Sequence, residues 1–375
     1  MIPYGKQSIG DDDIQAVVDT LRSDFITTGP KVAEFEKAVC EFTGAKFAVA
    51  VSNGTAALHC AAHAAGIGPG DEVIVTPMTF AASANCILYC GGTPVFADVL
   101  PGNLLINPEE VEKKITERTK AIIAVDYAGQ PCDYGILNKM AKKYNLVLIS
   151  DACHSIGAEY KNRRTGTLAG MTCFSFHPVK HITTGEGGMI TTDNSDFAEK
   201  MRVFRNHGIT TDYRQREKSG AWFYEMTDLG FNYRITDFQC ALGISQLKKL
   251  TEWISKRRKI AEKYDEAFKN LNNISILSVQ KYVLHAYHLY VLRISQKIGR
   301  DNIFKTLRNA GIGVNVHYIP VHMHPYYRDK LRYKPGICPV AENAYKEIIS
   351  IPMFSGLQEN NLQEVISKIR DAVKQ

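Results

Sequence analysis

Short apolar segments alternate with amphipathic ones through the first part of the chain. Residues 11–22 repeat apolar side chains at helical spacing, and residues 32–42 do the same after a loop at Thr27–Pro30. Strand-sized apolar runs then alternate with stretches predicted to be helical. The predicted strands are Phe47–Val51, Glu72–Thr76, Pro94–Ala97, Ala121–Val125 and Leu146–Ser150, and the predicted helices run to about Ala65 and over Ala81–Tyr89, Pro108–Lys114 and Tyr134–Tyr144. This alternation predicts an α/β domain whose mostly parallel sheet is covered on both faces.

The pattern changes in the second half of the chain. A strand pair is predicted around Gly185–Asp193, and one long helical stretch over about Asp237–Leu271. The predicted elements beyond it are the strands His288–Ile294 and Gly313–Tyr318 and the helices Asp301–Asn309 and Leu362–Lys374. They predict a smaller α+β domain with an antiparallel sheet. We place the boundary near residue 245, which gives a large domain over residues 1–245 and a small domain over residues 246–375.

The composition is that of a soluble globular protein. Of the 375 residues, 45% are hydrophobic and 22% are charged. No apolar run approaches the roughly 20 residues that span a bilayer, and residues 1–6 lack the pattern that opens a secretory signal. We therefore expect a cytoplasmic protein with no membrane segment. The net charge of +6 suits a phosphorylated ligand but is too weak to predict binding to nucleic acid.

The nine cysteines do not predict disulfides or a metal site. None has CxxC spacing, and several lie in apolar segments, as Cys40 and Cys240 do. Cys86 and Cys90 are near each other, but no second pair completes a zinc site. We expect reduced, mostly buried thiols.

Ligand chemistry is expected at the carboxyl ends of the parallel strands. After the strand Phe47–Val51, Ser52–Ala57 opens a helix with small residues and Gly54. The unpaired N–H groups of such a helix start suit a phosphate, and Thr55 adds a hydroxyl. The same residues also fit a plain strand–helix turn with Asn53 or Thr55 as N-cap.

Three further polar residues are candidates for ligand chemistry. Asp151 directly follows the strand Leu146–Ser150, where it could bind a metal, cap a helix or pair with a cationic ring nitrogen, and His154 lies three residues further on. Lys180 stands among small, aromatic and loop-forming residues, before a glycine-rich turn at Gly185–Gly188. Most lysines lie on solvated faces, but a partly desolvated one has a lowered pKa and can act as a nucleophile or form a Schiff base.

A phosphate site, a strand-end aspartate and a sequestered lysine together suggest pyridoxal 5′-phosphate (PLP). The helix start would take the phosphate, Asp151 would keep the pyridine nitrogen protonated, and Lys180 would form the imine. Phe80, which follows the strand Glu72–Thr76, is placed to stack on the pyridine ring.

Five motifs in the same order resemble those of the DegT/DnrJ/StrS sugar-nucleotide aminotransferases. They are Ser52–Leu58, Asp151–Gly157, Ser175–Gly188, Gly230–Asp237 and Val316–His322. The resemblance covers essentially the whole chain. It implies the fold-type I, aspartate aminotransferase-like architecture of PLP enzymes, with a large α/β/α domain and a small C-terminal domain.

The resemblance also implies roles for individual residues. Its Schiff-base lysine falls on Lys180, its pyridinium-pairing aspartate on Asp151, its ring-hydroxyl partner on His154 and its stacking aromatic on Phe80. Its phosphate-binding residues fall on Gly54, Thr55, Ala56 and Ser175. Many relatives carry Gln at the position of His154, and both residues can donate a hydrogen bond. Asn232 matches an asparagine that reaches the phosphate of the neighbouring subunit, which implies a homodimer with two shared active sites.

The implied reaction moves an amino group in two halves. L-Glutamate would convert PLP to pyridoxamine 5′-phosphate (PMP), which would then aminate a nucleotide-linked keto sugar, while Lys180 serves as nucleophile and proton carrier. The segment Val125–Pro131 has Asp-Tyr-Ala-Gly where many relatives have His before a Gly. In this it resembles the transaminases of the pseudaminic acid pathway, which implies UDP-4-keto-6-deoxy-N-acetyl-β-L-altrosamine as acceptor. Acceptors that give viosamine-, bacillosamine- or perosamine-type products remain alternatives.

Substrate contacts are expected in three places. The loop with His317, Tyr318 and His322 lies over the cofactor in the family, although a metal site or ordinary loop packing are alternatives there. Thr28 belongs to a second candidate substrate loop. Arg234 can pair with a nucleotide phosphate or the donor carboxylate, or form a structural ion pair, and Lys31 has the same alternatives.

Two rival functions are less compatible with the sequence. PMP-dependent sugar dehydratases of this family carry His in place of the reacting lysine, whereas this chain has Lys180. A non-catalytic relative would have lost some of the cofactor-binding residues, and all of them are present.

Overall fold

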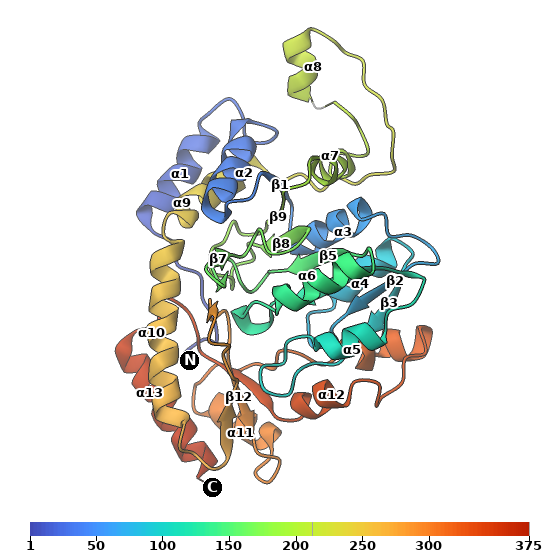
Figure 1. The fold of residues 1–375 in the computed structure, drawn as a ribbon. Helices are drawn as coiled ribbons and strands as arrows, with labels where there is room; N and C mark the ends of the chain where they lie inside the picture. Colours follow the sequence, from blue (N-terminus) through green and yellow to red (C-terminus); the bar gives the residue numbers. More distant parts are fainter. Residues whose placement is uncertain (212, 375) are drawn as a thin grey trace.

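A seven-stranded sheet forms the centre of the computed structural model, which describes residues 1–211 and 213–374 (Figure 1). Gln375, at the end of the predicted small domain, therefore lies outside the described residues. The strand order is β1-β9-β8-β5-β4-β2-β3, and every neighbouring pair is parallel except the two that involve β9. The strands are β1 (Phe47–Val51), β2 (Glu72–Val75), β3 (Thr93–Phe96), β4 (Thr119–Val125), β5 (Val147–Asp151), β8 (Met171–Ser175) and β9 (Gly188–Thr192). The predicted mostly parallel sheet is confirmed.

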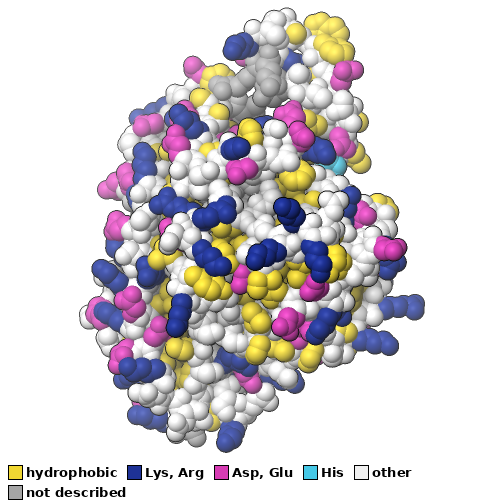
Figure 2. All heavy atoms as spheres, viewed as in Figure 1, with side chains coloured by type: hydrophobic (Ala, Val, Ile, Leu, Met, Phe, Trp, Pro, Cys, Tyr) yellow, Lys and Arg dark blue, Asp and Glu magenta, His cyan; other side chains and the backbone are white. Residues whose placement is uncertain are grey.

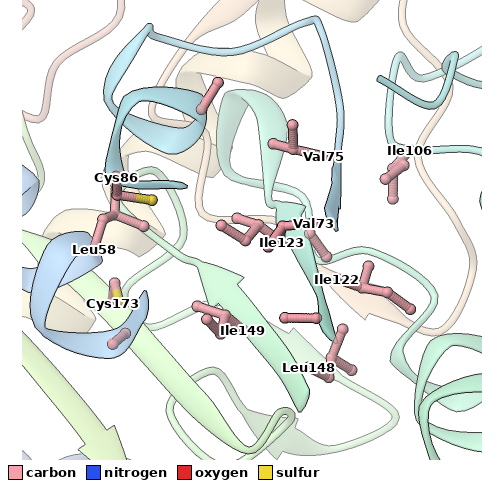
Figure 3. Packing of buried hydrophobic residues seen from close by; sticks show 14 of the residues in the cluster. Leu58, Val73, Val75, Cys86, Ile106, Ile122, Ile123, Leu148, Ile149 and Cys173 are labelled. Carbon is pink, nitrogen blue, oxygen red and sulfur yellow. The ribbon is translucent and has the colours of Figure 1, made fainter. Parts of the chain in front are cut away.

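Helices cover this sheet and bury its apolar strands. They are α3 (Gly54–Ala64), α4 (Ala82–Tyr89), α5 (Pro108–Lys113), α6 (Tyr134–Lys143) and α7 (Ser195–Phe204). The helix α3 contacts α4 and α7, whereas α5 contacts α6. Leu58 of α3 packs with Ile123, Ile149 and Cys173 of the sheet in one buried cluster (Figure 3). Nearly all of β2, β4, β5 and β8 is buried, and apolar residues form the centre of these strands, with polar residues mostly near their ends.

A smaller antiparallel sheet lies in the C-terminal part of the chain, at the lower end of Figure 1. Its order is β10-β12-β13, with strands at Ile274–Ile276, Tyr290–Ile294 and Ile348–Ile351. It shares a second core with α10 (Leu250–Phe268), α11 (Arg300–Asn309) and α13 (Glu359–Val373). The remaining α-helices are α1 (Asp11–Leu21), α2 (Pro30–Thr43), α8 (Tyr213–Ser219), α9 (Asp237–Leu247) and α12 (Pro339–Tyr345). The remaining strands form a small sheet in the order β11 (Val283–Leu284), β6 (Glu159–Tyr160) and β7 (Arg163–Arg164). The domain boundary near residue 245 stays a prediction.

Three predicted elements were wrong in detail. The stretch Asp237–Leu271 is two helices, α9 and α10, and Lys249 at the junction between them pairs with Asp12 and Asp13. Instead of a strand pair, the region Gly185–Asp193 holds one strand, β9, whose partners are β1 and β8. Gly313–Tyr318 forms no strand, since its pairing with the sheet is the single bridge from Asn315 to Ser350.

In the part of the chain that the structure describes, no helix is both long and apolar enough to cross a membrane.

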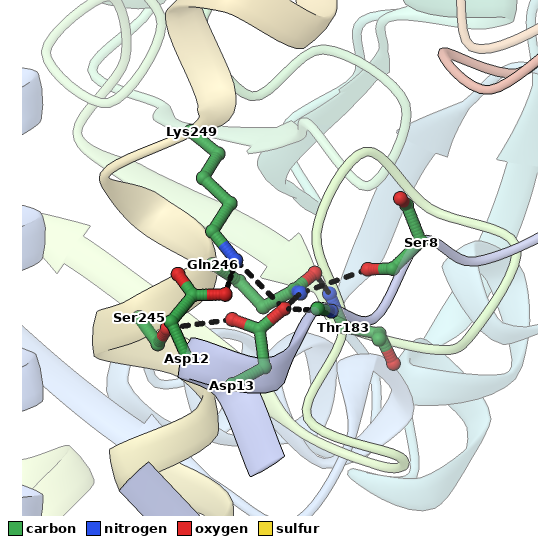
Figure 4. A network of polar contacts seen from close by, with 8 residues as sticks. Ser8, Asp12, Asp13, Thr183, Ser245, Gln246 and Lys249 are labelled. Atoms are coloured by element: carbon green, nitrogen blue, oxygen red, sulfur yellow. Dashed lines mark hydrogen bonds and ion pairs between the residues drawn. The ribbon is translucent and has the colours of Figure 1, made fainter. Parts of the chain in front are cut away.

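A buried carboxylate joins α1 to the junction of α9 and α10 (Figure 4). Asp13 is fully buried and accepts hydrogen bonds from Ser245 Oγ and Gln246 Nε2, both at 2.6 Å, while Lys249 Nζ lies 2.8 Å away. The side-chain oxygen of Gln246 accepts from the backbone N–H of Thr183, three residues after Lys180. Burial alone would raise the pKa of Asp13, but these hydrogen bonds and that of Gly10 N–H hold it below its usual value. The network therefore holds the loop after Lys180 in place.

We predict that Asp13→Ala lowers the free energy of unfolding by about 3 kcal/mol, because the Ser245 hydroxyl and one of the two N–H groups of Gln246 Nε2 lose their buried acceptor. Urea denaturation measures the change. The stabilisation is expected above about pH 4 and is lost as the pH falls through the lowered native pKa of Asp13.

Asp12 provides a matched control, because it pairs with the same Lys249 at 2.6 Å but is exposed. Asp12→Ala should cost less than about 1 kcal/mol. Equal losses in the two variants would contradict a special role for the buried carboxylate.

Candidate active site

Residues that follow three strands of the large sheet meet at one edge. They are Asn53–Ala56 after β1, the Asp151–His154 segment at the end of β5, and Ser175 and Lys180 at and after the end of β8. These strands are mutually parallel, since β9 is antiparallel to both of its neighbours, so their carboxyl ends share this edge. The structure thus brings together the three sequence motifs on which the cofactor prediction was based.

The start of α3 lies directly against Ser175. A Cβ atom on Gly54 would come within 2.9 Å of Ser175 Cβ and 3.2 Å of its Oγ, so only glycine permits this approach. Asn53 is the N-cap, and its side-chain oxygen accepts from Ala56 N–H at 2.8 Å. The positive end of the helix, the Ser175 hydroxyl and the partly exposed Thr55 together form a site that fits a phosphate.

Asp151 is buried at the end of β5 and held by α4. Its Oδ2 accepts from Ser83 Oγ at 2.6 Å, and its Oδ1 accepts from Cys153 N–H at 3.2 Å. A turn rather than a helix follows Asp151, so the helix-cap alternative is wrong. Each carboxylate oxygen keeps a free lone pair, which fits a protonated ring nitrogen. Sequence reasoning missed Ser83, because its position in an ordinary helix gives no sign of this contact.

Lys180 lies in the loop after β8 and is half-buried. Burial lowers the pKa of its amine, and the nearby Asp151 carboxylate acts in the opposite direction. A larger share of the amine is therefore neutral at pH 7 than in a solvated lysine, which is the form that a nucleophile or base needs.

Several imidazoles surround this amine. His154 Nε2 lies 3.0 Å from the Tyr318 hydroxyl, and the His154 ring is 4.3 Å from that of His288. The Nε2 atom of His288 is 3.5 Å from Lys180 Nζ. Burial, and after it the charge of Lys180, lowers the pKa of His154 and His288 well below its usual value and that of His317 to about 4. These rings are therefore neutral at pH 7.

Sequence reasoning missed His288. It stands at the start of a predicted strand, and the only signal for it was a polar residue within an apolar segment. It reaches Lys180 from 108 residues further along the chain.

The predicted residues Phe80, His317 and His322 differ in their distance from the Lys180 site. Phe80 is 62% exposed, and its ring centroid lies 6.2 Å from that of Tyr318. His317 binds Ser350 Oγ through Nδ1 at 2.9 Å, and its carbonyl accepts from the Tyr127 hydroxyl. His322 is fully buried, pairs with Glu342 at 2.9 Å and contacts the Phe96 ring. The structure therefore does not bring His322 to Lys180, and its placement matches the alternative of ordinary loop packing.

Thr28 and Arg234 line a cavity of about 600 Å³ beside α2 and α7. Arg234 donates to the Asn206 side chain at 2.9 Å. Lys31 forms an exposed ion pair with Glu34 at 2.6 Å, which matches the alternative that Lys31 makes a structural ion pair. Asn232 is exposed, and its backbone bridges to Asn206.

Among residues 1–211 and 213–374, no group of three or more His, Cys, Asp or Glu side chains is arranged to hold a metal ion.

Known proteins resemble this chain over its whole length. It is 41% identical to the spore coat polysaccharide biosynthesis protein SpsC of Bacillus subtilis, over all of this chain and 97% of that one. Helicobacter pylori PseC, an aminotransferase involved in the biosynthesis of pseudoaminic acid, superimposes with a TM-score of 0.93 at 34% identity, over all of this chain and 99% of PseC.

The sugar aminotransferase Spr1654 of Streptococcus pneumoniae, described as putative, is 32% identical and matches in two forms. Its PMP form has a TM-score of 0.93 and its PLP form 0.92, over all of this chain and 99% and 98% of Spr1654. The expected fold and PLP dependence are thereby confirmed. The model of the DegT/DnrJ/EryC1/StrS aminotransferase family matches residues 7–370, and the chain therefore belongs to this family of PLP-dependent sugar aminotransferases.

Proposed function

We propose that the protein transfers an amino group from L-glutamate to C4 of a 4-keto-6-deoxy sugar nucleotide. The observation that carries this proposal is the partly desolvated Lys180 amine beside the Asp151 carboxylate, at the same sheet edge as the Gly54–Ser175 contact. These are the three groups that PLP needs: an amine, a partner for its ring nitrogen and a site for its phosphate.

In this proposal each part of PLP has its own residues. Gly54, Thr55, Ala56 and Ser175 hold the phosphate, Asp151 pairs with the ring nitrogen, His154 with the ring hydroxyl, and Phe80 covers the ring. When bound, PLP supplies an electron sink for the negative charge that develops as a substrate C–H bond breaks.

The chain's own groups orient the reactants and move the proton. With PLP bound, the free Lys180 amine would take a proton from the substrate carbon as a general base and return it as a general acid. Asp151 stays oriented because Ser83 donates to it at 2.6 Å. His154 is neutral and fixed by the Tyr318 hydroxyl, so it adds no positive charge that would compete for the proton.

We further propose UDP-4-keto-6-deoxy-N-acetyl-β-L-altrosamine as the acceptor. The Asp126–Gly129 sequence and the similarity to PseC support this choice. His317 and Tyr318 would contact the sugar, and Thr28, Lys31 and Arg234 would contact the nucleotide or the donor carboxylate. His322 would act from its buried position by supporting their loop. The nine cysteines are all free thiols, which supports a cytoplasmic location.

A homodimer completes the proposed site. Residues 205–211 and 213–235 form an arm whose α8 end projects at the top of Figure 1, with apolar side chains visible near this end in Figure 2. Trp222 is 85% exposed and Leu229 76%, which is unusual for a monomer surface and is explained if a second copy covers them. Asn232 on the same arm would reach the phosphate held by the other subunit.

We predict that Lys180→Ala lowers turnover at least about 1000-fold, because it removes the nucleophile and the proton carrier together. The purified wild-type protein should be yellow with PLP, lose this colour with L-glutamate, and form a covalent adduct at Lys180 after borohydride reduction, seen by peptide mass spectrometry. Lys46→Ala, at an exposed position just before β1, serves as the control and should behave as wild type. Full turnover by Lys180→Ala, or a protein that PLP cannot colour, would refute the proposal.

We predict cross-subunit complementation between Lys180→Ala and Asn232→Ala. A heterodimer of the two variants, purified through two different tags, contains one intact shared site and should have about half of the wild-type activity. Each variant alone should be nearly inactive at low PLP concentration. A heterodimer no more active than the separate variants would show that Asn232 does not act across the interface.

The acceptor is tested with a panel of 4-keto sugar nucleotides and product detection by mass spectrometry. We expect the highest kcat/KM with the UDP-linked altrosamine derivative. A preference for a dTDP- or GDP-linked 4-keto hexose would replace this acceptor with the viosamine- or perosamine-type alternative, and a preference for the 4-keto precursor of a bacillosamine-type product would do the same within the UDP sugars.

A further inference from the structure

His288 is the imidazole nearest to the proposed reacting amine, and no role has yet been assigned to it. It is buried in the segment just before β12, and its Nε2 atom lies 3.5 Å from Lys180 Nζ. We propose that His288 is a positioning residue, which keeps the Lys180 amine aimed into the site in both protonation states of that amine. This inference rests on the proposed role of Lys180.

A neutral imidazole is suited to this task. A protonated amine can only donate a hydrogen bond, whereas a neutral amine can also accept one. Neutral histidine accepts at one ring nitrogen and donates at the other, and exchanging its tautomer exchanges the two roles. A neutral Lys180 amine still carries N–H donors, so the Nε2 atom of His288 can accept from it in both protonation states while the imidazole proton stays on Nδ1.

The surroundings of His288 keep it neutral. Burial is the main reason that its pKa lies well below the usual value, followed by the charge of Lys180 and then by His154, His181 and Arg257. The titratable groups around Lys180 are Cys153, Asp151, His154, His181, His288 and His317. Cys153 and Asp151 act to raise the pKa of Lys180, whereas the imidazoles are neutral and contribute hydrogen bonds rather than charge.

The other imidazoles of this cluster are fixed by different partners. His181 Nε2 is bonded to the Ala286 carbonyl at 3.0 Å, and His154 Nε2 to the Tyr318 hydroxyl. His317 is held by Ser350. The Nδ1 atom of His288 has no hydrogen-bond partner within the described part of the chain. The ring therefore has no other hydrogen bond that would draw it away from the amine.

The backbone of His288 is held rigidly, as positioning requires. The N–H groups of Ala286 and Leu289 donate to the carbonyls of Gly129 and Ala128, at 3.0 and 3.1 Å. Arg257, a buried cation on α10, donates to the carbonyl of Tyr287 at 3.1 Å and contacts that of His288 at 3.4 Å. Both flanks of His288 are thus fixed to neighbouring elements, and its ring position relative to Lys180 is determined by the fold.

The test compares His288→Leu with His288→Gln. Leucine fills the space without a polar atom, whereas the glutamine amide can reach the position of Nε2 and both donate and accept. We expect kcat with L-glutamate to fall about 10- to 100-fold in His288→Leu, the effect of losing one hydrogen bond to a charged group, with little change in KM. His288→Gln should recover most of this loss.

A second measurement reports on Lys180 without the reaction. The amine is labelled with acetic anhydride in the cofactor-free full-length protein at a series of pH values, and labelling at Lys180 is quantified by peptide mass spectrometry. The apparent pKa of Lys180 should shift downward in His288→Leu, because the protonated amine loses its acceptor. It should return toward the wild-type value in His288→Gln.

His285→Leu is the matched control, since it removes another buried imidazole from the same segment, whose Nδ1 accepts from Tyr287 N–H rather than from Lys180. It should leave kcat and the Lys180 labelling profile unchanged. If His288→Leu shows no thermal unfolding transition, His288→Asn takes its place, because its amide is too short to reach the amine and the same loss of kcat is expected.

Wild-type kcat and labelling in His288→Leu would overturn the inference, as would a glutamine variant as impaired as the leucine variant. Failure of the proposed function is distinguishable, because the wild-type protein itself would then show no Lys180-dependent turnover.

Discussion

The proposed reaction needs a Lys180 amine that is partly shielded from water and partly uncharged, and the groups around this amine provide both conditions. Burial lowers the pKa of Lys180 because the charged amine loses hydration. The same loss of hydration would raise the free energy of a second cation nearby. The imidazoles that surround Lys180 add no such cation because burial keeps them neutral. The nearby Asp151 limits how far the pKa of Lys180 falls. Burial, neutral hydrogen-bonding groups and a single carboxylate are therefore parts of one electrostatic arrangement.

The fold provides this arrangement from distant parts of the chain. Parallel strands bring Gly54, Asp151 and Ser175 to one edge, and the glycine allows α3 to approach Ser175 closely. The loop after Lys180 is fixed through Gln246, which belongs to the buried network of Asp13. Since the loop rests on a network more than 60 residues away from it in sequence, the position of the amine depends on the packing of α1 against α9.

Features that depend on local sequence patterns were predicted from the sequence, and features that depend on contacts between distant residues were missed. Continuous apolar runs predicted strands of the large sheet, and the motifs around Lys180 and Asp151 predicted the cofactor. The ion pair of Lys249, at the junction of α9 and α10, was missed because its partner Asp13 lies 236 residues earlier in the chain. His288 was missed for the same physical reason, since nothing in its own segment signals a contact with Lys180. His322 appeared in a motif that suggested substrate contact, yet its neighbour Glu342 holds it in the core.

The turn Asp126–Gly129, where the chain departs from the commoner family pattern, is buried. Substrate therefore cannot touch most of it directly, and its influence must pass through the groups that it holds. The Tyr127 hydroxyl donates to the His317 carbonyl, and Ala128 and Gly129 accept from the segment that carries His288. A Cβ on Gly129, whose φ is +105°, would lie 2.8 Å from the His154 carbonyl oxygen, so the turn also fixes that strand-end segment. One buried turn thus contacts several of the loops around Lys180, and a change of sequence there would act on the site by moving those loops rather than by exchanging a direct contact.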